Sequence, residues 1–257
     1  MANRMSLTEE ELTELKRLRL TEKRVSSELS VPLHEIMNDR EGCLAYLQRV
    51  KEEVGAPNDK VAVSILMKRY AFLPAIYLYA MTVWNKRLNI TFENVSIESS
   101  YQGDLWLPSF CFNDLSFFEA SEPRHEWRRE AVAEVFAKHI FPLMNAFVRI
   151  SKISKYILWE NIAVYIFWLY ESFLNECKDD AVRERAVDDF QFIVKHASGE
   201  LFGDYHQNPL TKYYTKSVYN KEQNREVRVR TTCCFTNQLK KNMKSCNICP
   251  VTCNKLK

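Results

Sequence analysis

Hydrophobic positions in the first 85 residues recur at the spacing of an α-helix. Four leucines between residues 7 and 18 lie near one face of a predicted helix, and residues 43–54 form a second amphipathic segment that ends at Gly55. A long apolar helix is expected over residues 60–84. Between the first two of these predicted helices, the stretch "TEKRVSSELSVPLHEI" is compatible with the second half of a helix-turn-helix.

The period changes at Arg87, where "LNITFENVSIESS" begins to alternate apolar and polar residues. Alternation is typical of a half-buried strand, and an aromatic stretch around Pro108 continues in a similar manner. Together they predict a small antiparallel unit of two or three strands. Helical spacing returns over residues 123–198, where "KYILWENIAVYIFWLY" is apolar nearly all round and is expected to be the central buried helix.

These patterns predict a helix-dominated α+β fold, with the small antiparallel sheet in the middle of the chain. The expected parts are an N-terminal helical region (1–86), a sheet and helical body (87–208), and a basic C-terminal segment (209–257) that carries the cysteines. We expect the last part to form one compact unit with the body. Within it, "YTKSVY" and "EVRVRTTCCF" flank "NKEQNR" as the two arms of a hairpin would.

Composition is that of an ordinary soluble protein, with 46% hydrophobic and 27% charged residues. The N-terminal residues are charged throughout and do not resemble a signal peptide. The apolar stretch at 156–170 contains Glu160 and is too short to cross a bilayer. The expected location is therefore the cytoplasm, either free or peripheral to the inner face of the membrane, with no transmembrane segment.

Charge is distributed unevenly along the chain. Residues 209–257 carry eleven Lys and Arg against two Glu, although the whole chain has a net charge of only +3. A basic tail attracts anionic ligands or acidic partner proteins.

Five of the eight cysteines lie in this tail, in "TTCCFTNQLKKNMKSCNICPVTC". In the cytoplasm thiols stay reduced, which favours metal chemistry over disulfides. The CxxC portion can chelate one metal, whereas neighbouring cysteines usually diverge unless the backbone is bent. A two-iron cluster relaxes that requirement because its ligands attach to two irons. Spacing alone does not distinguish a structural zinc site from an iron–sulfur cluster. The other cysteines, Cys43, Cys111 and Cys177, are predicted to be small buried residues.

The segment "RTTCCF…SCNICP" resembles the C-terminal signature of the FhuF-type ferric siderophore reductases. The likeness includes Arg230 before the cysteine pair and extends to "LWEN" in the apolar helix, with Trp159 and Asn161, and to "NPL" at 208–210. Two features depart from the family pattern. The spacer between the cysteine pairs is one residue longer than usual, and Cys253 is additional.

The resemblance implies a [2Fe–2S] cluster and one-electron reduction of a ferric siderophore, which releases Fe(II). It implies no catalytic residue beyond the cluster. The implied ligands are Cys233, Cys234, Cys246 and Cys249, with Cys253 as an alternative ligand. Because the sequence contains no GxGxxG or P-loop, we expect the electrons to come from an external ferredoxin or flavodoxin.

Several other residues are expected to act around the cluster. Backbone N–H groups, Thr231, Thr232 and Ser245 are predicted to donate hydrogen bonds to its sulfurs. His206 lies in a predicted loop and could contact a substrate. The residues predicted to attract an anionic ferric complex are Arg228, Arg230, Lys240, Lys241 and Lys244.

The alternative interpretation is a non-enzymatic zinc-binding protein that uses its basic tail to dock a protein or nucleic acid. A mild isoelectric point and few aromatic residues among the basic ones disfavour nucleic acid, so we expect none as partner.

Overall fold

The computed structural model describes residues 5–220, 224–240 and 245–253. The chain is 56% helical, with small sheets and a cysteine-rich C-terminal region, which confirms the helix-dominated α+β prediction. The bounds of the helices are α1 Glu9–Lys16, α2 Leu33–Asn38, α3 Arg40–Val54, α4 Asp59–Tyr70, α5 Phe72–Trp84, α6 Arg124–Ala133, α7 Phe141–Ser151, α8 Lys155–Trp168, α9 Asp180–Gln191 and α10 Pro250–Cys253. A π-helical segment, Glu134–Ile140, joins α6 to α7.

The strands are short. Their bounds are β1 Met5–Ser6, β2 Leu20–Thr21, β3 Val31–Pro32, β4 Lys86–Leu88, β5 Val95–Glu98, β6 Tyr101–Gln102, β7 Leu105–Trp106, β8 Ser109–Phe112, β9 Ser116–Glu119, β10 Val218–Asn220 and β11 Arg225–Val227. They form a four-stranded sheet in the order β2-β8-β5-β3, a three-stranded sheet in the order β1-β9-β4, and the two-stranded units β6-β7 and β10-β11.

The N-terminal residues contribute to these sheets as well as to helices. β2 pairs in parallel with β8, and β3 pairs antiparallel with β5, so two strands of the N-terminal region share a sheet with the strands beyond Arg87. The stretch compatible with a helix-turn-helix does not form one, because its residues contribute to β2, β3 and the short helix α2. The sheet is also larger than expected, and one of its strand pairs is parallel. Strands this short form only when they pair with another strand, and the local sequence does not indicate which strand that is.

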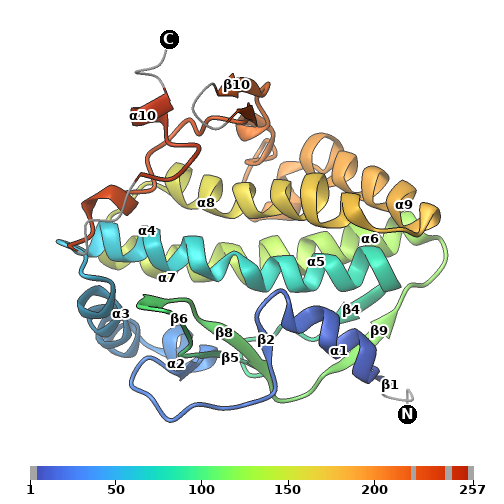
Figure 1. The fold of residues 1–257 in the computed structure, drawn as a ribbon. Helices are drawn as coiled ribbons and strands as arrows, with labels where there is room; N and C mark the ends of the chain where they lie inside the picture. Colours follow the sequence, from blue (N-terminus) through green and yellow to red (C-terminus); the bar gives the residue numbers. More distant parts are fainter. Residues whose placement is uncertain (1–4, 221–223, 241–244, 254–257) are drawn as a thin grey trace.

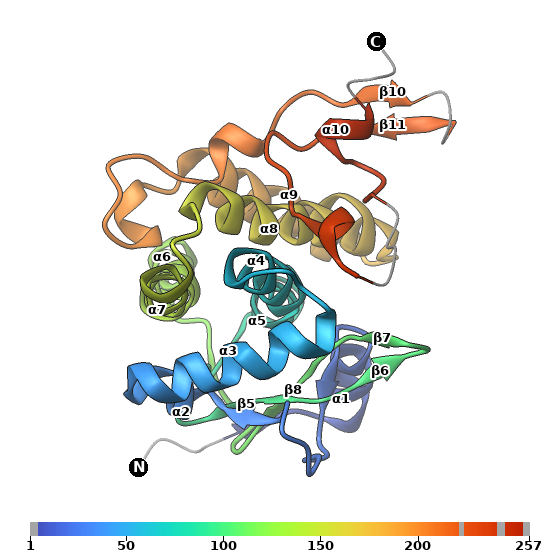
Figure 2. The same ribbon diagram turned by 90° about the vertical axis from the view of Figure 1, so that its left-hand side faces the viewer.

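The elements stack in layers (Figures 1 and 2). The sheets of β1–β9 lie at one side with α1, α2 and α3, and α4 and α5 run across the middle beside α6 and α7. Helices α8 and α9 cover the opposite side, and the β10-β11 pair lies beyond α8. The predicted long helix at 60–84 is two consecutive helices, α4 and α5, which are separated at Ala71. Pro74, which has no backbone N–H to donate, lies in the first turn of α5.

Helix α8 is the element that connects this body to the C-terminal segment. It packs on α4 within the core, and residues 228–240 and 245–253 lie over the other side of it (Figure 2). The tail also reaches the end of α3, where the backbone N–H of Lys240 donates to the carbonyl of Gly55 at 3.0 Å. Gly55 ends α3 as predicted, in a left-handed conformation with φ 63°.

Two helical stretches, Asp59–Trp84 and Arg124–Ser151, are long and apolar enough to cross a membrane by length and composition alone. In the fold, 94% of the most apolar window of the first and 50% of that of the second are buried. A helix in the core of a protein meets the same criteria, so these stretches are weak indications of a membrane span.

Candidate metal centre

The two cysteine pairs of the tail lie against each other. The backbone N–H of Arg230 donates to the carbonyl of Ile248 at 2.9 Å. This bond joins the segment before Cys233 and Cys234 to the loop between Cys246 and Cys249. The Sγ atoms of Cys234 and Cys246 lie 3.9 Å apart. Within the second pair, the N–H of Cys249 donates to the carbonyl of Cys246 at 2.9 Å, which closes the CxxC turn.

The bend that adjacent cysteines require is present. Phe235, the residue after the pair, adopts a left-handed conformation with φ 61°, which is unfavourable for a residue with a side chain. Its backbone N–H donates to the Cys233 Sγ at 3.3 Å. The reversal of the chain at Phe235 allows the two neighbouring thiols to be held in one loop instead of on opposite sides of a strand.

A buried carboxylate on α8 anchors the residues before the cysteine pair. Glu160 is only 2% exposed. One of its oxygens accepts hydrogen bonds from the N–H and hydroxyl of Thr231, at 2.6 and 2.9 Å. The other accepts from the N–H of Thr232 at 2.7 Å and from its hydroxyl. A carboxylate that satisfies four donors on two consecutive residues fixes their position strongly.

Asn161, the next residue of α8, links the tail to α4. Its Oδ1 accepts from the guanidinium of Arg230 at 2.6 Å, and its Nδ2 donates to the carbonyl and hydroxyl of Ser64 at 2.9 and 3.0 Å. The Ser64 hydroxyl donates in turn to the backbone carbonyl of Cys234 at 2.9 Å. The cysteine pair is therefore held from two helices through fully buried polar groups.

Positive charge lies under the cysteine pair. Arg230 is 4% exposed, and its guanidinium lies 3.5 Å from the Glu160 carboxylate, beneath the loop. Lys68, one turn beyond Ser64 on α4, places its Nζ 3.9 Å from the Cys234 Sγ. These cations are positioned to stabilise thiolates.

The pKa values of the Cys234 and Cys246 thiols reflect this environment. A hydrogen bond from Cys246 lowers the pKa of the Cys234 thiol to about 4, against the effect of burial, and Lys68 lowers it further. The same hydrogen bond raises the pKa of Cys246, and burial raises that pKa further. The pair therefore shares one proton, with Cys234 as the thiolate, which is the form that binds metals.

The pKa values of Cys233 and Cys249 shift in opposite directions. Burial raises the pKa of Cys233. Burial also opposes ionisation of Cys249, but the backbone N–H groups of Thr252 and Val251 outweigh it and lower the pKa of that thiol. Cys253 lies one helical turn after Cys249 in α10, with its Sγ 3.8 Å from Nδ2 of Asn220 on the hairpin.

The predicted sulfur-bonding residues require a correction. Thr231 and Thr232 direct their hydroxyls to Glu160 and not to a cysteine. Thr236 is the threonine that contacts a sulfur, with its Oγ1 3.1 Å from the Cys234 Sγ. Ser245 is placed as expected and hydrogen-bonds the Cys249 thiol.

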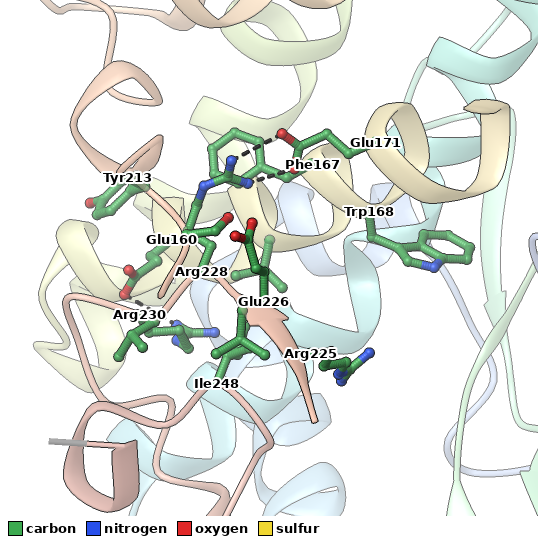
Figure 3. Close-up of a pocket in the computed structure, with 14 residues that line it drawn as sticks. Glu160, Phe167, Trp168, Glu171, Tyr213, Arg225, Glu226, Arg228, Arg230 and Ile248 are labelled. Carbon is green, nitrogen blue, oxygen red and sulfur yellow. Dashed lines mark hydrogen bonds and ion pairs between the residues drawn. The ribbon is translucent and has the colours of Figure 1, made fainter. Parts of the chain in front are cut away.

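The residues predicted to attract an anionic complex occupy different environments. Arg228 makes two hydrogen bonds to the Glu171 carboxylate, at 2.5 and 3.0 Å, beside a cavity of about 230 Å³ (Figure 3). Arg230 is almost fully buried beneath the loop, although it contributes to the lining of the same cavity, and its contact with a substrate stays a prediction. Lys240 is exposed. Lys241 and Lys244 lie outside the described residues.

Among the three scattered cysteines, Cys43 and Cys111 are buried as predicted, whereas Cys177 is partly exposed. The predicted hairpin is present as the antiparallel pair β10-β11, in which Tyr219 lies opposite Glu226. Its connecting residues 221–223 lie outside the described residues.

The thiols fit an iron–sulfur cluster in kind. Among residues 5–220, 224–240 and 245–253, no three His, Cys, Asp or Glu side chains are grouped closely enough to chelate a single ion. A [2Fe–2S] cluster takes four cysteine thiolates, divided between two irons. Cys233, Cys234, Cys246 and Cys249 are the four thiols that could hold such a cluster.

Comparison with known families agrees with this site. The sequence matches a family model described as "Ferric iron reductase FhuF-like transporter" over residues 65–217. The chain belongs to this FhuF-like ferric iron reductase family. The match contains α8 with Glu160 and Asn161 and ends before the clustered cysteines, so it is independent of the cysteine signature and confirms the resemblance. No curated protein matches the sequence.

Sequence reasoning missed four residues of the centre: Glu160, Ser64, Lys68 and Thr236. The signal for Glu160 was visible, because a carboxylate beside an asparagine in an otherwise apolar helix must find partners when it is buried. Ser64 and Lys68 gave no such signal, since polar residues are common in amphipathic helices.

Proposed function

We propose that this FhuF-like protein is an iron–sulfur oxidoreductase that reduces a ferric siderophore by one electron. Cys233, Cys234, Cys246 and Cys249 would hold a [2Fe–2S] cluster, which supplies the electron when it is bound. Siderophores present hard oxygen ligands that bind Fe(III) far more tightly than Fe(II), so a single electron makes the iron labile.

The observation that carries this proposal is the attachment of the cysteine pair to the core. Glu160 fixes Thr231 and Thr232, while Ser64 fixes the Cys234 carbonyl. Rigid attachment through a buried network limits movement of the ligands when charge changes, as an electron-transfer site requires. A zinc site that only folds the tail has no need of such support from two core helices.

The protein's own residues would then hold the centre and control its charge. Lys68 and Arg230 place positive charge beside Cys234 and favour the reduced form, which raises the reduction potential. The Phe235 N–H and the Thr236 hydroxyl act in the same direction through hydrogen bonds to sulfur.

The electron would come from an external donor protein. A ferredoxin or flavodoxin with an acidic surface would be complementary to the basic tail, in which Lys240 is exposed. Such donors and reduced thiols are both found in the cytoplasm, which is the location we propose.

The test is the visible spectrum and metal content of protein purified without oxygen. We expect a red-brown protein with about two irons per chain that bleaches with dithionite. The bleached protein should regain colour when a ferric siderophore is added. A colourless protein with one zinc, which takes up no iron on reconstitution, would exclude the reductase and leave a zinc-folded docking tail.

A further inference from the structure

The largest of the described cavities lies beside α8. It has a volume of about 880 Å³ and is bounded by the first turns of α8 and by residues 195–212. This is within the usual range for small-molecule sites, roughly 300–1,000 Å³. The cavity beside Arg228 is far smaller, at about 230 Å³.

The lining of the large cavity has one sign of charge. Lys155, Lys195 and Lys212 all contribute to it, together with His206. No acidic side chain lines it, and in the part of the chain that the structure describes none of the three lysines forms an ion pair. Their recorded partners are aromatic rings: Lys212 Nζ lies 3.4 Å from the centre of the Tyr156 ring, and Lys155 Nζ lies 4.8 Å from that of Phe141.

Aromatic side chains accompany this charge. Tyr205 lines the cavity and accepts a hydrogen bond at 2.8 Å from the indole N–H of Trp159, a side chain that is only 1% exposed. Tyr156 is 64% exposed and presents a flat ring at the cavity. A ligand that combines negative charge with planar rings would find partners for both.

The loop that closes the cavity is held firmly. The Asn208 Nδ2 donates to the carbonyls of Ile193 and Ala197 at 2.8 and 3.2 Å. Gly199 lies so close to the returning chain that a Cβ there would be 2.2 Å from the Tyr205 carbonyl oxygen. The wall is therefore a packed part of the fold.

We propose that this cavity binds the ferric chelate and selects complexes that carry net negative charge and aromatic rings, as tris-catecholates do. The inference rests on the proposed function. Three doubly charged catecholates leave Fe(III) with a large negative charge, whereas three singly charged hydroxamates neutralise it. Only the negatively charged tris-catecholate complex is attracted by three lysine ammonium groups in a concave site.

The position of the cavity suits electron transfer from the cysteines. Trp159 faces the cavity, and the adjacent Glu160 binds Thr231 and Thr232, which precede the cysteine pair. One helix therefore forms the wall of the cavity and carries the support of the proposed cluster.

The test uses gallium complexes, because Ga(III) matches Fe(III) in charge and coordination but is not reduced. The full chain, purified without oxygen, is titrated calorimetrically with a tris-catecholate and with a tris-hydroxamate gallium complex. We expect the tris-catecholate to bind at least about tenfold more tightly, and the preference to shrink as salt is added.

Variants locate the binding. The triple variant Lys155→Gln, Lys195→Gln, Lys212→Gln should lose the preference, while the corresponding triple arginine variant should keep it. Lys178→Gln, at an exposed lysine outside the cavity, is the matched control and should bind as the wild type does. Equal affinity for both complexes, no binding of either, or a preference that survives the triple glutamine change would overturn the proposal.

Failure of the proposed function would look different. If the gallium complexes bind as expected but neither ferric complex re-oxidises the reduced protein, the binding site stands and the reductase proposal falls. If a ferric complex is reduced but the gallium preference is absent, the reductase stands and the charge selection falls.

Discussion

Glu160→Gln is the substitution that most directly tests how the cysteine loop is held. The carboxylate accepts four hydrogen bonds from Thr231 and Thr232 and lies 3.5 Å from the Arg230 guanidinium. Both charged side chains are almost fully buried, with exposures of 1% for Arg230 and 2% for Glu160. A glutamine keeps the shape of the side chain but removes its charge, and its amide NH2 group, itself a donor, replaces the oxygen that accepts from two of the four donors.

The expected cost follows from these contacts. Removing one partner of a buried ion pair typically costs about 3–5 kcal/mol, because the other charge remains buried without compensation. Each donor left unpaired costs about 1–3 kcal/mol, but these losses overlap with the first and do not add to it. We therefore expect the cysteine loop to open about 3–5 kcal/mol more easily.

The assay is native-state hydrogen exchange at the amides of Thr231 and Thr232, with iron content measured in parallel. Both amides should lose protection, and the variant should be purified with less iron. The control is Glu171→Gln, which breaks the half-exposed pair with Arg228 and should cost less than about 1 kcal/mol. A change below about 1 kcal/mol for Glu160→Gln, or an equal loss in the control, would refute the anchoring role.

Three further predictions follow from other parts of the structure. Cys253→Ala should keep its iron, since that thiol contacts the hairpin, whereas Cys249→Ala should lose it; iron retained by the second and lost by the first would reverse the ligand assignment. Burial lowers the pKa of His139 from 6.5 to about 4, so folding requires the neutral ring, and stability should fall as pH drops through this window, by roughly 3 kcal/mol in urea titrations. His139→Gln should flatten that dependence, and an unchanged slope would contradict it. Gly199→Ala should lower the unfolding temperature and weaken chelate binding, because its Cβ would collide with the Tyr205 carbonyl; normal binding by a stable variant would show that the wall can yield.

The sequence was sufficient for the features that depend on local pattern. Helical spacing predicted the apolar helices, and the left-handed end of α3 followed from Gly55. The adjacent cysteines before CxxC predicted a metal centre and resembled the signature of one family. The match over residues 65–217 confirmed that family. Such features are readable because periodicity, turn residues and ligand spacing are properties of neighbouring residues.

Tertiary structure decided which distant residues meet. Strands β2 and β3 are two residues each and form only because β8 and β5 supply their partners. Arg230 was expected to attract an anionic complex. It is almost fully buried, because Asn161 and Glu160 on α8 satisfy its guanidinium. The lysines of the large cavity come from α8 and from two short helical segments after α9, and only the fold brings them around one cavity. A buried charge is stable only with its partner in place, and the partner's position is a property of the whole packed chain.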